Sequence, residues 1–102
     1  MVSQKAFKQR IDFMVKSLEK LFDAKVHGLK TEREFFVEVV NGVKTFEVRL
    51  NDRDYKVGDI LLLTEYQNDK YTGDYITKRV TYILDEKPYV PDGYVVMAIG
   101  EL

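Results

Sequence analysis

The first periodic stretch of the chain, residues 3–23, repeats apolar positions with the period of an α-helix. Ser3 stands just before the pattern, and serine is a favoured helix N-cap. We interpret the charged side of this helix first as a solvated face and second as a basic binding surface. The apolar positions are Phe7, Ile11, Met14, Val15, Leu18, Leu21 and Phe22, and the basic ones are Lys5, Lys8, Arg10, Lys16 and Lys20.

A short strand and a second helix are predicted next. Residues 25–30 form a brief apolar stretch, which indicates a strand. In the sequence T-E-R-E, Thr31 and Glu34 have the spacing of a capping box, so we expect the helix to begin at Thr31. Asn41-Gly42 predicts its left-handed end, because glycine has no steric penalty there. The buried face of this helix is predicted to be Phe35, Phe36, Val39 and Val40.

Residues 45–50 change to a period of two, which is typical of a half-buried strand. We expect the apolar set to face the core and the polar set to face solvent. The apolar set is Phe46, Val48 and Leu50, and the polar set is Thr45, Glu47 and Arg49.

The second half of the chain predicts three further strands, at residues 60–66, 75–84 and 94–99. Turn residues at 51–54 and 57–59 and loops at 67–74 and 85–93 separate them. The order is therefore helix, strand, helix and four strands. It predicts an α+β fold: a small mixed β-barrel of about five strands, with one packed helix and an extra N-terminal amphipathic helix.

Composition narrows the class of protein. A chain of 102 residues with 45 % hydrophobic and 32 % charged residues fits one globular domain. It has no cysteine and one histidine, so we expect no disulfide, no metal site and no cofactor. No apolar run approaches the roughly 20 residues of a membrane span, and the N-terminus has no signal-like apolar block, so we expect a cytoplasmic, soluble protein without membrane contact.

Charge is distributed unevenly along the chain. Residues 1–30 carry seven Lys/Arg against three Asp/Glu, a net +4, and residues 31–102 carry nine against fourteen, a net −5. Clustered cations supply most of the affinity for a phosphate backbone. Nucleic-acid binding would therefore have to be local to a cleft or use the N-terminal segment.

Gly42, Lys44, Glu47 and Arg49 reproduce the pattern G-x-K-x-x-E-x-R. With this pattern the chain resembles the ASCH domain of the PUA-like superfamily, and it is most similar to an uncharacterised bacterial and phage branch. Four further stretches agree in order: T-F-E-V-R-L-N-D-R-D-Y-K-V-G-D-I-L-L-L, Y-T-G-D, V-T-Y-I-L-D and D-G-Y-V-V. The likeness covers roughly residues 25–100, which divides the chain into an N-terminal helix, 1–23, and an ASCH-like domain, 24–102.

The resemblance implies a PUA-like barrel whose signature residues line a cleft for RNA or a nucleotide-like ligand. Some ASCH relatives are enzymes, one branch resembling an amidohydrolase that acts on acetylated cytidine and another a ribonuclease. The amidohydrolase branch uses a lysine, matched here by Lys44. It has a hydroxyl residue where this chain has Glu47, and a carboxylate does not replace an activated threonine.

The candidate ligand residues have structural alternatives. Lys44 would also be favourable simply as a cation beside a helix C-terminus, and Glu47 and Arg49 would also pair on an exposed strand. Tyr71 could stack on a base or pack over the barrel mouth. We expect His27 to be structural and Asp59 to cap a turn. The full set of candidates is Lys44, Glu47, Arg49, Lys30, Arg53, Lys70 and Tyr71, with Lys44 and Glu47 as the catalytic candidates.

Three functions follow as hypotheses. The first is a module that binds RNA or a nucleotide in the signature cleft. The second is a hydrolase acting on a modified nucleoside or RNA, with Lys44 and Glu47 as an acid/base pair. The third is an interaction domain that self-associates or binds a protein partner through the N-terminal helix.

Overall fold

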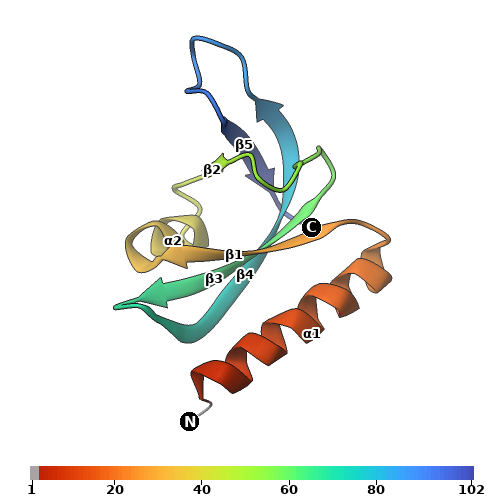
Figure 1. The fold of residues 1–102 in the computed structure, drawn as a ribbon, viewed down its shortest axis with the longest axis vertical. Coiled ribbons are helices and arrows are strands. Elements are labelled where there is room, and N and C mark those ends of the chain that lie inside the picture. Colours follow the sequence, from red (N-terminus) through yellow and green to blue (C-terminus); the bar gives the residue numbers. More distant parts are fainter. Residues whose placement is uncertain (1–2) are drawn as a thin grey trace.

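One curled sheet forms the frame of the protein and stays open along one side as a half-barrel (Figure 1). The computed structural model describes residues 3–102. The strands lie in the order β1-β3-β4-β5-β2, with β1 parallel to β3 and the other neighbours antiparallel. This arrangement confirms the predicted α+β class. The strands are β1 (Val26–Glu32), β2 (Phe46–Leu50), β3 (Ile60–Gln67), β4 (Lys70–Leu84) and β5 (Tyr94–Gly100).

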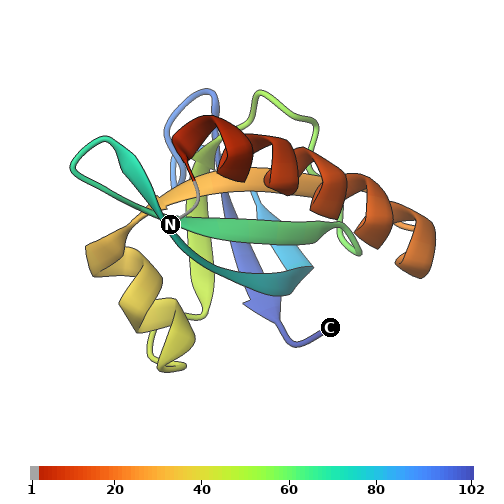
Figure 2. The same ribbon diagram turned by 90° about the horizontal axis from the view of Figure 1, so that it is seen from below.

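Two helices, α1 (Gln4–Phe22) and α2 (Arg33–Val40), pack on different sides of this sheet (Figure 2). Val39 of α2 joins the inner apolar cluster, inside the curl, together with Leu61 and Leu63 of β3. Phe7 and Ile11 of α1 form the outer apolar cluster with Val26, Ile60 and Leu62. The run 60–63 is apolar throughout because β3 is buried on both faces.

The N-terminal helix is fixed at both ends. The predicted cap is confirmed, since Ser3 Oγ accepts a hydrogen bond from the Ala6 N–H at 3.0 Å. The Gln4 amide pairs with the Tyr71 backbone, donating to its carbonyl at 2.9 Å and accepting from its N–H at 2.7 Å. Near the other end, Glu19 Oε2 accepts from the Val26 N–H at 3.0 Å. Between these two attachments, α1 lies close to β1.

Gly28 of β1 permits this close approach. A Cβ atom at this position would lie 3.4 Å from Ile11 Cγ2 and 3.5 Å from Val15 Cγ2. These are the shortest distances that ordinary van der Waals contact allows. A methyl group therefore fits at residue 28, whereas a larger side chain does not fit beneath α1.

The second helix begins later than the sequence predicts. β1 pairs with β3 as far as Glu32 opposite Tyr66, so Thr31 belongs to the strand and its side chain is buried. The N-cap is Glu32, which makes no side-chain capping hydrogen bond. The predicted capping box of Thr31 and Glu34 is therefore wrong, because strand pairing takes the residue that would have capped the helix.

The end of α2 is as predicted. Gly42 has a φ of 76°, and its N–H donates to the Val39 carbonyl at 3.1 Å. The Val43 and Lys44 N–H groups both reach the Glu38 carbonyl, at 2.9 and 3.0 Å. These bonds satisfy helix-terminal carbonyls and turn the chain toward β2.

The predicted loop at residues 67–74 is wrong. β3 extends to Gln67 and β4 begins at Lys70, so only Asn68 and Asp69 connect them. Both residues have positive φ, 54° and 60°, which is the backbone of a two-residue hairpin turn whose twist matches the strands.

The predicted faces of β2 are reversed. Phe46, Val48 and Leu50 are 46 %, 50 % and 54 % exposed, whereas Glu47 is 2 % exposed. Periodicity establishes the alternation but not which set faces the curl. β2 is an edge strand, its outer face lies beyond the helices, and its inner face meets cations that neutralise Glu47.

Among residues 3–102, neither helix combines the length and the apolar character needed to span a membrane.

Enlarging Gly28 tests the packing of α1. Gly28→Ala should change the free energy of unfolding by less than about 1 kcal/mol, whereas Gly28→Ile should lower it by about 1–3 kcal/mol through overpacking against Ile11 and Val15. Urea denaturation followed by circular dichroism measures both. A Gly28→Ile variant as stable as the wild type would show that α1 does not lie closely on β1.

Candidate functional site

Glu47 is the centre of a three-residue ion cluster on the inner side of β2. Its Oε1 accepts from Lys44 Nζ at 2.8 Å, and its Oε2 accepts from Arg49 Nε at 3.0 Å. Lys44, Glu47 and Arg49, the predicted signature residues, are thus brought together. A buried carboxylate is tolerated only when it is paired and hydrogen-bonded, and both conditions hold here.

Arg49 also connects the two open edges of the half-barrel. Its Nη1 donates to the Lys30 carbonyl at 3.0 Å, and its Nη2 donates to Thr31 Oγ1 at 3.1 Å. Arg53 makes a similar link, donating through Nη1 to the Gly28 carbonyl at 3.2 Å. Two arginine side chains therefore bridge β1 to the chain around β2, where no backbone ladder joins these edges.

Lys44 is held more tightly than a helix-end cation would be. Besides Glu47, its Nζ donates to the Phe46 carbonyl at 2.6 Å. It also lies 5.0 Å from the ring centre of Phe46 and 5.9 Å from that of Phe35, within the range of cation–π attraction. The ammonium group is thus oriented from several sides.

Two hollows border the bridging arginine. The basic groove, about 850 Å³, runs between α1 and β1 and holds Lys30, Arg49, Arg53 and Tyr71. The edge hollow, about 660 Å³, follows β2 beside α2. Lys30 and Arg49 line both, so the two hollows meet at these side chains. The edge hollow is otherwise lined by Thr31, Glu32, Phe35, Glu38, Val43, Lys44, Phe46, Glu47 and Val48.

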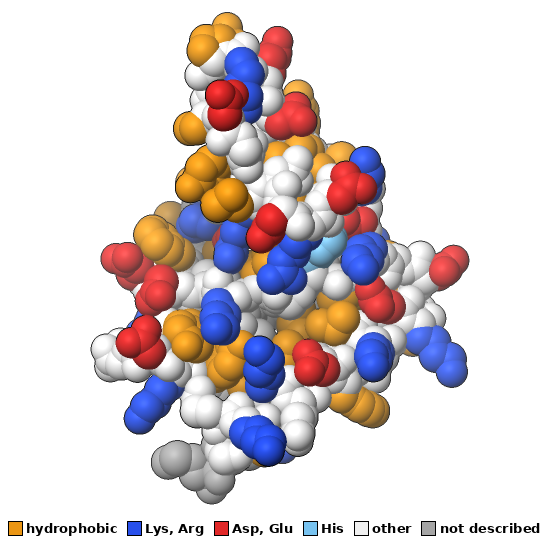
Figure 3. All heavy atoms as spheres, in the orientation of Figure 1, with side chains coloured by type: hydrophobic (Ala, Val, Ile, Leu, Met, Phe, Trp, Pro, Cys, Tyr) orange, Lys and Arg blue, Asp and Glu red, His pale blue; other side chains and the backbone are white. Residues whose placement is uncertain are grey.

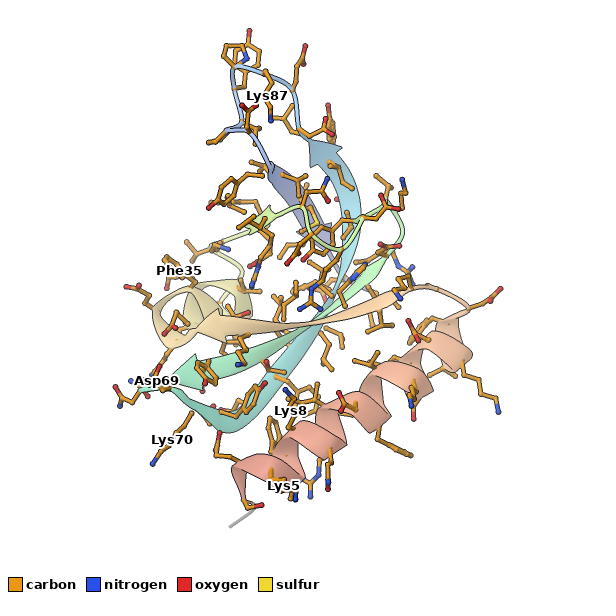
Figure 4. All side chains as sticks on the ribbon, in the orientation of Figure 1. Lys5, Lys8, Phe35, Asp69, Lys70 and Lys87 are labelled. Atoms are coloured by element: carbon orange, nitrogen blue, oxygen red, sulfur yellow. The ribbon has the colours of Figure 1, made fainter. Side chains whose placement is uncertain are left out.

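The basic groove carries an excess of positive charge. Its acidic side chains are Asp12 and Glu19, and Glu19 is already bonded to the backbone of β1. Figure 3 shows Lys and Arg side chains bordering the hollow beside α1. Figure 4 shows Lys8 between α1 and the sheet. The basic side chains of the groove are Lys8, Lys16, Lys25, Lys30, Arg49 and Arg53.

Of the remaining predicted ligand residues, Tyr71 packs against other aromatic rings and Lys70 is exposed to solvent. Tyr71 packs against Phe7 and Tyr66, with ring centres 5.5 and 5.1 Å away, and also lines the basic groove. Lys70 lies at the tip of the β3–β4 hairpin and lines neither hollow (Figure 4). Packing over the sheet therefore accounts for most of Tyr71, and the structure separates Lys70 from the other candidates.

Glu65 is a second buried carboxylate, and no sequence motif predicts it. Glu65 Oε2 accepts from Arg33 Nη1 at 3.0 Å, and its Oε1 accepts from the Thr72 hydroxyl. Arg33 is 32 residues away along the chain, so no local spacing reveals the pair. Within the described part of the chain, every fully buried side-chain nitrogen or oxygen has a hydrogen-bond partner.

His27 and Asp59 form a buried pair inside the curl. His27 Nε2 lies 2.7 Å from Asp59 Oδ2, which also accepts from the Lys56 N–H at 2.9 Å. This second bond is the predicted turn cap. His27 lies outside both hollows, and its ring packs at a tilt of 59° against Tyr55, with the ring centres 4.7 Å apart.

Burial raises the pKa of the Tyr55 phenol above its ordinary value of 10.0, against the lowering effect of Arg53 and Arg49. The neutral phenol is therefore favoured in the fold. The buried neutral phenol contributes fully to the free energy of unfolding below pH 10, the ordinary pKa of tyrosine, and this contribution is lost as the pH rises through the folded-state pKa.

Removing the carboxylate of Glu47 tests the ion cluster. Glu47→Ala should lower the free energy of unfolding by about 2–3 kcal/mol, because it leaves two partly buried cations without their partner, and Glu47→Gln by less. Glu101→Ala, which removes an exposed partner of Lys78, is the control and should cost under about 1 kcal/mol. Equal losses in Glu47→Ala and Glu101→Ala, measured in urea, would contradict a structural role for the cluster.

The raised pKa of Tyr55 predicts a pH dependence. Above about pH 10 the wild type should lose stability relative to Tyr55→Phe, which has no phenol to ionise. Denaturation series from neutral pH to strongly alkaline pH measure this difference. Tyr89→Phe, at an exposed tyrosine, is the control and should follow the wild type. Parallel curves for wild type and Tyr55→Phe would contradict burial of this phenol.

Comparison with known proteins gives the family. Residues 26–99, from the start of β1 nearly to the end of β5, match a domain of unknown function, DUF3850. An "Uncharacterized 12.9 kDa protein in GpA 3'region" of Escherichia phage P2 is 35 % identical over 81 residues, which are 78 % of this chain and 73 % of the phage protein. The phage relative agrees with the predicted phage branch, and the resemblance to the ASCH domain stays a prediction. The chain belongs to the DUF3850 family.

Proposed function

We propose that this domain binds single-stranded RNA or a nucleotide, with phosphate groups held in the basic groove. One observation carries the proposal: six Lys and Arg line this groove with two Asp and Glu, in a chain whose formal net charge is −1. Clustered cations of this kind bind phosphate backbones by releasing counterions. This local concentration of positive charge supports the proposal, although residues 31–102 carry a net charge of −5.

Four lysines of the groove have no carboxylate partner among the described residues, and one of them, Lys30, has its ammonium group 4.8 Å from the ring centre of Tyr66 and 5.7 Å from that of Tyr71. Among residues 3–102, no carboxylate lies within 4.0 Å of the ammonium groups of Lys8, Lys16, Lys25 or Lys30. Arg49 and Arg53, by contrast, are engaged by the bridge to β1. We therefore assign phosphate contact mainly to the lysines and positioning of the groove to the arginines.

The length of the groove favours a chain of phosphates over a single one. Lys8 and Lys16 are eight positions apart on α1, which separates them by about 12 Å along the helix axis. Separate phosphates of a single strand can meet these two lysines without either side chain having to extend along the helix.

The edge hollow supplies a site of different chemistry beside the groove. Phe35 and Phe46 form apolar walls, and Lys44 and Arg49, both hydrogen-bonded to Glu47, form its polar side. Aromatic walls hold bases by stacking. The likeness to the ASCH domain supports this choice, because there the same signature positions line the ligand cleft. The base of a nucleotide would lie here, with its phosphate toward Lys30.

A hydrolase acting on a modified nucleoside or RNA is the second candidate. The 2.8 Å contact of Lys44 with Glu47 favours it, as an acid/base pair requires such proximity. The occupation of both Glu47 oxygens by cations disfavours it, because neither is free to take a substrate proton. Intact acetylated cytidine after long incubation with the protein would count against it.

Charge reversal in the groove tests RNA binding. Lys8→Glu combined with Lys16→Glu should weaken binding of a single-stranded RNA at least ten-fold, since two phosphate contacts become repulsive. It should also reduce the slope of log K against log salt by about 1.4. Fluorescence anisotropy at low salt measures both quantities.

The matched control is Lys5→Glu combined with Lys70→Glu, which changes the net charge equally at lysines outside both hollows. It should weaken binding by much less. Absence of RNA binding by the wild type at low salt, or equal losses in the two double variants, would overturn the proposed site.

A further inference from the structure

The outer face of the sheet is covered by α1 on one half only. The helix packs over β1 and β3 through the outer apolar cluster, while β5, β2 and the end of β4 lie beyond it (Figure 1). Strand register places Phe46 beside Ala98, Val48 beside Val96 and Leu50 beside Tyr94 on the uncovered half. β4 adds two more residues, opposite Ala98 and Val96. The apolar face consists of Phe46, Val48, Leu50, Tyr82, Leu84, Tyr94, Val96 and Ala98.

This apolar face is exposed and contains no charged side chain. The three residues of β2 are about half exposed, Tyr82 is 55 % exposed and Tyr94 is 39 % exposed. Since a fully exposed aromatic side chain presents about 150–250 Å², the face offers on the order of 500 Å². A contiguous patch of this size on a small protein is usually an interaction site.

We propose that the apolar face packs against the same face of a second copy of this chain. A standard interface buries about 800 Å² on each partner, with an apolar core and a polar rim. The apolar face, on the order of 500 Å², supplies the apolar core of such an interface, and the polar surface around it would form the rim.

The absence of charged side chains from the apolar face favours a two-fold symmetric interface. In such an interface each residue near the axis meets its own copy, so charged side chains there would repel. The blocked free edge of β2 also favours packing of two sheet faces over pairing of two strand edges. Lys44 Nζ bonds the Phe46 carbonyl, and this occupies an acceptor that a strand added at the edge would need.

This surface is distinct from the N-terminal helix. The apolar stripe of α1 is used within the chain, where Phe7 and Ile11 are buried against the sheet. Phe13 and Leu21 are exposed on α1. Self-association through the helix is therefore a separate prediction, and substitutions on the two surfaces distinguish it from the interface proposed here.

Sedimentation velocity of the full chain at roughly 1 to 100 µM tests the proposal, because this range reveals a micromolar dimer. The wild type should sediment as a dimer, and Val48→Glu should raise the dimer dissociation constant at least about 30-fold. Phe13→Glu is the matched control on α1 and should leave the dimer intact. Circular dichroism and the urea midpoint establish that each variant is folded, and Leu50→Glu replaces Val48→Glu if that variant unfolds.

Two results would overturn the proposal. One is a wild type that stays monomeric over the whole concentration range, which would leave the apolar face to a different partner. The other is a dimer that Phe13→Glu dissociates and Val48→Glu does not, which would place the contact on the helix.

Discussion

The buried carboxylate of Glu47 is the constraint on which the rest of the open side depends. Burying an ionised group without partners is costly, so Lys44 and Arg49 must stay beside it. Arg49, oriented in this way, extends to the Lys30 carbonyl and Thr31 and links β2 to β1. Between β1 and β2, side-chain hydrogen bonds take the place of a backbone ladder. Because side chains and not a backbone ladder join β2 to β1, a hollow remains on each side of Arg49. These two hollows, the basic groove and the edge hollow, form the candidate ligand site.

α1 turns one of the hollows into a groove with two walls. Gly28 allows the helix to lie directly on β1, and Gln4 and Glu19 fix it by hydrogen bonds to backbone groups of β4 and β1. The family match begins at residue 26, after this helix. Lys8 and Lys16 therefore belong to a wall outside the matched range. In our proposal, this wall adds phosphate contacts to a site whose other residues come from the sheet domain.

Much of the fold follows from sequence periodicity, and the misses have physical causes. Apolar residues at steps of four and three, such as Phe7, Ile11 and Met14, predict α1, and Gly42 predicts the end of α2, because both signals are local. The sequence pattern predicts the faces of β2 in reverse, because alternation does not tell which side of an edge strand the sheet encloses. The local spacing predicts Thr31 as a helix cap, but its pairing with β3, opposite Glu65, is non-local and places it in the strand. The contact of Arg33 with Glu65 joins residues 32 positions apart, beyond any motif spacing.

An NMR titration of the full, isotopically labelled chain with a single-stranded RNA oligonucleotide tests most directly whether the basic groove is the ligand site. Amide signals should shift along the sheet-facing side of α1 and along β1, including those of Lys8, Lys16 and Lys30. Signals of the β3–β4 turn around Lys70 should stay in place. Shifts confined to that turn, or no shifts at low salt, would contradict the assignment of the ligand site to the basic groove.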